Sequence, residues 1–230
     1  MSTKQTVAAH VDRNAADLLA LSHWIHQHPE VAWQEHESSA HIADFLESRG
    51  FTVTRAPEGI ETAFVARKGT GDFQIALCAE YDALPGLGHA CGHNIIASAS
   101  VGAALALAEV AGELDATITV FGTPAEEGGG GKITMLERGI FAGTHVAALI
   151  HPGPVDVVHG EPFAVKHLEV AYTGKAAHAA AYPERGINAS DAFTIAQVAI
   201  GSGSAADAAE ATEAAGRFTS DITEHAGKVE

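Results

Sequence analysis

Apolar side chains recur at helical spacing over residues 9–28, from Val11 to Ile25, and the pattern stops at Pro29. This spacing predicts an amphipathic helix that ends before the proline. A second run of the same kind predicts a helix over residues 36–49, ending at Gly50.

Short apolar runs rich in β-branched residues then alternate with helical patterns. Strands are predicted at 51–54, 62–66, 74–79, 116–122 and 146–150. Between them, an Ala-rich helix is predicted to run to about residue 111 with Asn94 as its N-cap, and a short helix is predicted over 131–140. This alternation predicts an α/β sheet, in which ligands bind beyond the carboxyl ends of the strands.

The pattern changes after residue 160. Residues 163–173 alternate like a strand, 174–186 read as a loop, and 187–200 predict a helix. From Gly201 the chain is small, acidic and poor in large apolar residues, which predicts a disordered tail or a loosely attached helix. We therefore expect three parts: residues 1–160, 161–200 and 201–230.

Composition narrows the functional classes. A net charge of −16 argues against a nucleic-acid or anionic-membrane surface, and no apolar run approaches the roughly 20 residues that span a bilayer. The first residues lack the apolar core of a signal peptide, so the expected location is the cytoplasm. Two cysteines are too few for a disulfide scaffold, and Cys78, inside an apolar run, is expected to be a core residue.

Cys91 and His93 lie one residue apart on a glycine-flanked turn. A thiolate beside an imidazole can bind Zn²⁺, Mn²⁺ or a related divalent ion. Two alternatives are a buried cysteine next to a surface histidine and a catalytic cysteine with a histidine base. The second does not explain why two carboxylates follow downstream.

Those carboxylates are Glu126 and Glu127, after Pro124-Ala125 and before four glycines. Successive side chains of an extended segment point in opposite directions, so one can bind metal while the other faces an attacking water. The alternative is a solvated acidic turn. The glycine run is not a nucleotide-binding loop, because Lys132 is followed by Ile133 instead of Ser or Thr.

His151 follows a strand of buried type and precedes Pro152, which suits a rigid imidazole ligand. Asp82, shortly after the 74–79 strand, is either a carboxylate that orients a metal-binding histidine or a strand-end turn residue.

Taken together, these residues resemble the M20 metallopeptidases, in particular the amidohydrolase branch that cleaves N-acyl amino acids, dipeptides and aminobenzoyl-glutamate-like amides. The resemblance covers about 180 residues. It rests on LSHWIHQHPE (21–30), AEYDALP (79–85), HACGH (89–93), PAEEG (124–128), HPGP (151–154), GKAAHAAA (174–181) and GINA (186–189).

The resemblance implies a zinc-peptidase-like catalytic sheet with helices on both faces, followed by the beginning of an inserted α+β lid or dimerisation domain. It implies two divalent ions (Zn²⁺ or Mn²⁺, with Co²⁺ as an alternative), bridged by Cys91 and bound further by His93, Glu127 and His151. Glu126 would be the general base, and His178 would reach in from the lid to steady the tetrahedral intermediate. The expected partners are a small amide substrate and, with a complete lid, a second copy of the chain.

Two departures qualify these expectations. Asn94 stands where many members of the branch carry Asp, as in a subset of amidase and dipeptidase relatives. The family motifs also stop near Ile200, before the lid is complete and before a last metal-binding histidine, for which His225 is a weak candidate. Gly201-Ser-Gly-Ser204 reads as an engineered joint or a frameshifted end. We therefore expect a truncated enzyme, with a catalytically impaired, metal-binding remnant that acts only through association as the alternative.

Overall fold

The computed structural model describes residues 2–158 and 170–201, and its contacts divide the chain into two units, Met1–Val158 and His159–Glu230. The first unit contains a five-stranded mixed sheet with the order β1-β2-β4-β3-β5. The strands are β1 (Thr52–Arg55), β2 (Phe64–Gly69), β3 (Phe73–Ala79), β4 (Ala116–Gly122) and β5 (Val146–Ala148). The α/β prediction is confirmed.

The sheet contains three neighbouring parallel strands. β4 and β5 both run parallel to β3, with Ala79 opposite Gly122 and Leu77 opposite Ala148. β1 and β2 pair antiparallel, and β2 runs antiparallel to β4. Every residue of β4 is buried. The carboxyl ends of β3, β4 and β5 therefore meet at one edge, and the residues that follow them are brought together there.

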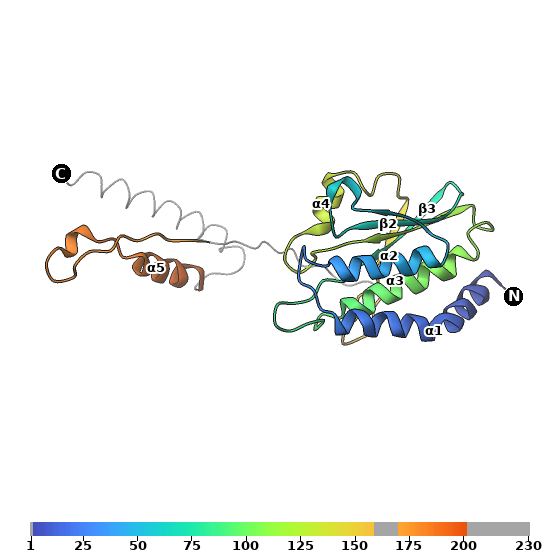
Figure 1. Cartoon of the computed structure of the whole chain (residues 1–230), viewed down its shortest axis with the longest axis horizontal. Helices are drawn as coiled ribbons and strands as arrows, with labels where there is room; N and C mark the ends of the chain where they lie inside the picture. Colours follow the sequence, from blue (N-terminus) through green and yellow to red (C-terminus); the bar gives the residue numbers. More distant parts are fainter. Residues whose placement is uncertain (1, 159–169, 202–230) are drawn as a thin grey trace. The chain divides into compact units, whose positions relative to one another are not determined.

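Helices cover both faces of this sheet (Figure 1). On one face, α2 (His36–Ser48) and α3 (His93–Ala108) pack on the apolar side chains of the strands, and α1 (Thr3–Gln27) packs on α3. On the other face, α4 (Gly131–Glu137) contributes Met135 to a smaller core with Val65, Ala76 and Phe121. The expected two-sided arrangement of helices is therefore present.

Two helix starts differ from the sequence predictions, each for a local reason. α1 begins at Thr3 instead of residue 9, because Ser2 and Gln5 form a capping box. α3 begins at His93 and its N-cap is Gly92, so the prediction that Asn94 caps this helix is wrong. Gly92 adopts φ +81°, which favours glycine, and the Asn94 amide instead donates to the Ser22 hydroxyl at 2.9 Å.

The extended segment between α1 and α2 ties two loops to each other. The Glu30 carbonyl accepts a hydrogen bond from Ala83 N at 2.7 Å, and Val31 forms a parallel bridge with Ala83. Four residues on, the buried Glu35 carboxylate accepts a hydrogen bond from Ala125 N at 2.7 Å. The loops after β3 and β4 are therefore both bonded to one short stretch of chain.

The described part of the second unit consists of Lys175 paired antiparallel with Ile187, a 3₁₀ turn at Pro183–Arg185 and helix α5 (Ala189–Gly201). The strand predicted over 163–173 falls mostly outside the described residues, and its described part, 170–173, is not a strand. The predicted tail, 201–230, lies outside them except for Gly201. The assignment of this unit to a lid stays a prediction.

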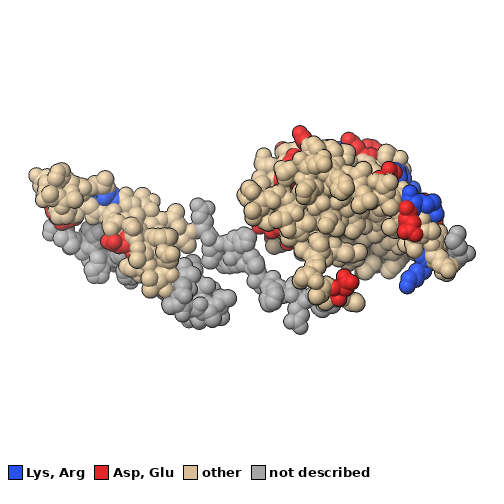
Figure 2. Space-filling view, turned by 90° about the horizontal axis from the view of Figure 1, so that it is seen from below, with Lys and Arg blue, Asp and Glu red and all other residues tan. Residues whose placement is uncertain are grey.

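The space-filling view shows small groups of charged side chains on the face of the first unit that it presents, with the basic ones gathered at the end where α1 begins (Figure 2). Two arginines of this unit form ion pairs with acids: Arg49 with Asp17, and Arg55 with Asp44 and Glu47. Within the described ranges, no helix combines the length and the apolar character needed to cross a bilayer.

Candidate metal centre

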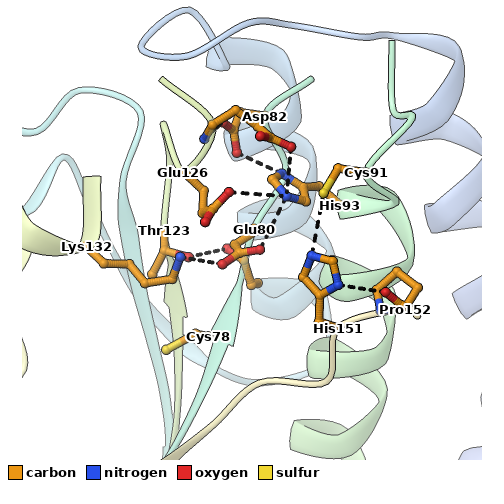
Figure 3. A network of polar contacts seen from close by, with 12 residues as sticks. Cys78, Glu80, Asp82, Cys91, His93, Thr123, Glu126, Lys132, His151 and Pro152 are labelled. Atoms are coloured by element: carbon orange, nitrogen blue, oxygen red, sulfur yellow. Dashed lines mark hydrogen bonds and ion pairs between the residues drawn. The ribbon is translucent and has the colours of Figure 1, made fainter. Parts of the chain in front are cut away.

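A cluster of acidic, imidazole and thiol groups lies at the edge where the three parallel strands end (Figure 3). The loop after β3 supplies Glu80 and Asp82, the loop after β4 supplies Glu126 and Glu127, and the loop after β5 supplies His151. Cys91 and His93 come from the turn that starts α3. The structure thus brings together four predicted metal ligands, Cys91, His93, Glu127 and His151, with the predicted general base Glu126 and with Asp82.

His93 and Asp82 form the buried base of the cluster. The Asp82 carboxylate accepts a hydrogen bond from His93 Nδ1 at 2.9 Å with one oxygen and from Glu127 N at 2.9 Å with the other. Burial alone would raise the pKa of Asp82, but the bonds from His93 and from the main chain outweigh it and lower the pKa. An ionised Asp82 holds the His93 proton on Nδ1, which leaves Nε2 free to bind a metal.

His93 Nε2 is buried and has no hydrogen-bond partner among the residues that the structure describes. It lies 3.4 Å from Glu80 Oε2 and 3.7 Å from an oxygen of each of Glu126 and Glu127. Burial lowers the pKa of His93, yet the bond to Asp82 and the nearby carboxylates raise it overall. A lone pair facing carboxylate oxygens is unfavourable unless a cation lies between them, so this arrangement fits a proton or a metal ion.

Cys91 and His151 form the second half of the cluster. Cys91 Sγ lies 3.5 Å from His151 Nε2, and His151 Nδ1 donates to the Pro152 carbonyl at 2.7 Å. Two ligands of a tetrahedral zinc ion, at usual Zn–S and Zn–N lengths, are separated by about 3.6 Å. The observed separation therefore suits a shared metal ion.

Burial and the negative field of the glutamates raise the pKa of Cys91 to about 12. At neutral pH the thiol therefore carries its proton unless a cation lies beside it. A metal ion would supply the charge that deprotonates the thiol. This environment argues against the catalytic cysteine that the sequence left open, because a nucleophilic thiolate needs a lowered pKa.

The paired glutamates differ in their surroundings. The Glu127 side chain is 21% exposed, and its Oε1 is buried with no hydrogen-bond partner in the described part of the chain. The Glu126 side chain is 41% exposed, and burial together with the charge of Glu80 raises its pKa. The residue before them, Ala125, has φ +54°, which is uncommon for alanine and is held in place by the bond to Glu35.

Within the described part of the chain, candidate ligand atoms fall into two overlapping groups, each with all its atoms within 4.8 Å of one another. One consists of Cys91, His93 and His151, and the other of Glu80, His93 and Glu126. His93 belongs to both. The chemistry of these donors, one thiol, two imidazoles and several carboxylates, is the chemistry that binds Zn²⁺ or Mn²⁺.

The sequence interpretation missed Glu80, Lys132 and Glu35. Glu80 directly follows a parallel strand, which is a signal that was available, while the roles of Lys132 and Glu35 depend on tertiary contacts. His178 lies in the second unit, where its Nδ1 accepts hydrogen bonds from Ala180 N and Ala181 N, so its place at this centre stays a prediction. His225 lies outside the described residues.

A parallel sheet with convergent metal-binding side chains at its carboxyl edge is typical of metal-dependent α/β hydrolases. The model of peptidase family M20/M25/M40 matches residues 76–228. The chain belongs to this family. The matched region passes Ile200, so the expectation that the resemblance stops there is wrong. None of the family motifs quoted above lies among the small and acidic residues after Ile200.

Individual relatives agree with the family match. The chain is 41% identical over 207 residues to an Xaa-Arg dipeptidase from Mus musculus, covering 84% of this chain and 48% of the relative. It is 36% identical to one component of the p-aminobenzoyl-glutamate hydrolase from Escherichia coli (strain K12), covering 82% of this chain and 43% of that component. The chain thus spans about half the length of the curated relatives it matches.

A solved structure shares the fold. The YXEP protein of Bacillus subtilis, described as a dinuclear metal binding peptidase from the M20 family, superposes with a TM-score of 0.53 at 30% identity, covering 61% of this chain and 42% of that protein.

Proposed function

We propose that this chain carries the metal-dependent catalytic site of an amidohydrolase. Its substrate would be a small N-acyl amino acid, a dipeptide or an aminobenzoyl-glutamate-like amide. The observation that carries the proposal is the buried His93 Nε2, which faces three glutamate oxygens and has no hydrogen-bond partner among the described residues, next to the Cys91 and His151 pair. The activities for which the dipeptidase and hydrolase relatives are named support amide hydrolysis.

Two divalent ions, Zn²⁺ or Mn²⁺, would be held by Cys91, His93, Glu127 and His151. Buried atoms of His93 and Glu127 that have no hydrogen-bond partner in the described residues support this assignment. A bound divalent ion supplies polarisation of the scissile carbonyl and lowers the pKa of a water molecule.

Glu126 would move the proton. Its side chain is the more exposed of the pair, so it can contact both the attacking water and the leaving nitrogen. The raised pKa of Glu126, caused first by burial and then by Glu80, brings it closer to neutral pH. A general base and acid works best when its pKa lies near the working pH.

Asp82 would act through His93. By accepting the Nδ1 proton it fixes the ring orientation and keeps Nε2 directed at the cluster. Its second oxygen holds Glu127 N, so one buried carboxylate positions two ligand-bearing residues. Asp82 is therefore a positioning residue.

The test compares metal content and amide turnover. Metal per chain is measured after exhaustive dialysis, and hydrolysis of N-acyl amino acids, dipeptides and p-aminobenzoyl-glutamate is assayed with added Zn²⁺, Mn²⁺ or Co²⁺. Glu126→Gln should keep its metal and lose turnover by about 10²–10⁴-fold, because it removes the proton shuttle. Glu127→Gln should lose metal as well as turnover. Glu61→Gln serves as the matched control, because Glu61 is exposed.

Equal metal occupancy in the Glu126 and Glu127 variants would overturn the division of roles. A dialysed wild-type chain that binds no divalent ion would overturn the proposed function itself. Metal binding without any amide turnover would leave the alternative, a metal-binding chain that works through association.

A further inference from the structure

Glu80 and Lys132 form an ion pair at the floor of the cluster (Figure 3). Glu80 directly follows β3 and its side chain is only 5% exposed, while Lys132 reaches it from α4 on the opposite face of the sheet from α3. Lys132 bonds Glu80 Oε1. Neither Glu80 nor Lys132 has a role in the function proposed above.

The other oxygen of Glu80 is directed at the candidate metal ligands. Glu80 Oε2 is buried and lies 3.4 Å from the buried His93 Nε2, and neither atom has a hydrogen-bond partner within the described ranges of the chain. At usual zinc bond lengths, a nitrogen and an oxygen ligand of one tetrahedral ion are separated by about 3.4 Å. Among the described residues, Glu80 and His93 also share a group of possible ligand atoms within 4.8 Å of one another, whose third member, Glu126, the proposed function assigns to proton transfer.

Lys132 changes the charge that an incoming metal ion meets. A buried carboxylate without a counter-charge is costly, so the ammonium group stabilises Glu80 while no metal is bound. The same positive charge repels a divalent cation that approaches Glu80 Oε2. Lys132 therefore stabilises the metal-free state and opposes metal binding through a single contact.

We propose that Glu80 belongs to the metal-binding set of this centre and that Lys132 is its internal counter-ion, so that the pair sets the affinity for metal. This inference rests on the proposed function, since it concerns the same ions. Lys132 is a positioning residue in this scheme and Glu80 a ligand.

A double-mutant cycle tests the pair, with Zn²⁺ affinity measured by competition with a chromogenic chelator. Glu80→Gln should weaken Zn²⁺ binding by about 10–100-fold, the range typical of groups that support metal ligands, or more. Lys132→Met should strengthen it by at least about tenfold, because the repulsion is removed while the carboxylate remains. The double variant, which replaces an ion pair by a neutral pair, should fall between the two.

Two further measurements separate a ligand from a nearby charge. The visible absorption of the Co²⁺-loaded protein should change in Glu80→Gln, because a ligand is altered, and should keep its band positions in the control Lys68→Met. Lys68 donates to the Arg49 carbonyl at 2.9 Å and pairs with Ile118 in the sheet register, at the end of β4 away from the cluster. The unfolding temperature of metal-free Lys132→Met should be lower than that of wild type. Added Zn²⁺ should raise it by more than it raises that of wild type.

An unchanged Co²⁺ spectrum in Glu80→Gln, or a Lys132→Met variant that binds Zn²⁺ no more tightly than wild type, would overturn this inference while leaving the proposed function intact. Absence of Zn²⁺ and Co²⁺ binding by the wild-type chain would instead remove the proposed function. If Lys132→Met fails to fold, the Glu80→Gln/Lys132→Met double variant is measured instead. Zn²⁺ affinity near that of wild type together with an altered Co²⁺ spectrum would support the proposal, and an unaltered Co²⁺ spectrum would contradict it.

Discussion

Replacing Asp82 by asparagine is the sharpest test of how the centre is held. The buried carboxylate accepts two hydrogen bonds, from His93 Nδ1 and from Glu127 N, each 2.9 Å long. The asparagine side chain would have nearly the same shape but a single acceptor oxygen. Its NH₂ group would therefore face either the His93 N–H or the Glu127 N–H, donor against donor.

The magnitude follows from these contacts. A hydrogen bond to a charged group contributes about 1.5–3 kcal/mol, and one of the two is lost, so the metal-free protein should lose about that much stability. Where the imidazole avoids the clash by moving its proton to Nε2, the metal-binding lone pair disappears. Loss of such a supporting partner typically costs 10–100-fold in metal affinity, which corresponds to about 1.4–2.8 kcal/mol.

The assay measures the Zn²⁺ dissociation constant by chelator competition and the unfolding free energy by denaturant titration with a chelator present. Asp44→Asn is the matched control, because its side chain is 70% exposed and pairs with Arg55 at the surface. This control should change stability by less than about 1 kcal/mol and leave Zn²⁺ binding as in wild type. An Asp82→Asn protein with wild-type Zn²⁺ affinity would refute the idea that Asp82 fixes the His93 tautomer.

Three further outcomes are expected. Burial raises the pKa of Glu35 above 4.5, despite hydrogen bonds that include one from Ala125 N, so ionisation of Glu35 lowers the stability of the fold as pH rises from 4.5 through its folded-state pKa. In denaturant titrations, the unfolding free energy of Glu35→Gln should therefore increase relative to that of wild type over this pH interval. A difference in unfolding free energy that stays constant with pH would contradict the assignment. Gly92→Ala should weaken Zn²⁺ binding, because the φ of Gly92 is +81° and the new Cβ would lie 2.7 Å from Pro152 Cγ, in the loop that follows His151. Unchanged Zn²⁺ affinity in isothermal titration would contradict this, since it would show that the two loops move apart at little cost. His178→Ala should keep bound metal and lose turnover by a factor equivalent to about 2.7–4 kcal/mol if its imidazole stabilises the oxyanion, and a wild-type rate would show that it is only a loop residue.

Sequence patterns located this site because its ligands follow strands. The 116–122 strand is reproduced without error and the 74–79 strand to within one residue, so the positions of Glu126 and Glu127 beyond a strand end could be anticipated. The motif spacing suggested Cys91 and His93 as metal ligands, and the resemblance to a family implied the separate roles of Glu126 and Glu127. The structure places these residues within reach of one another, and their catalytic and metal-binding roles stay predictions.

Other features could not be anticipated, because they depend on contacts between distant elements. Lys132 lies 52 residues beyond Glu80, and Glu35 lies 90 residues before Ala125. Neither pair leaves a local periodic signal. The start of α3 was also misplaced, since a polar Asn94 looks like a cap while the left-handed Gly92 before it in fact begins the helix. The sheet order, with β4 between β2 and β3, likewise follows from tertiary packing.

The segment between α1 and α2 has a consequence for how the site comes into being. Because Glu30 and Glu35 bond the loops after β3 and β4, the cluster is assembled only when chain regions separated by up to 90 residues have met. Closing such a long loop is slow compared with forming local helices. The ligands should therefore reach their final geometry late in folding, together with the docking of the N-terminal helices. Metal affinity in this protein would then report on the folding of the whole first unit, and early intermediates would bind the ion weakly.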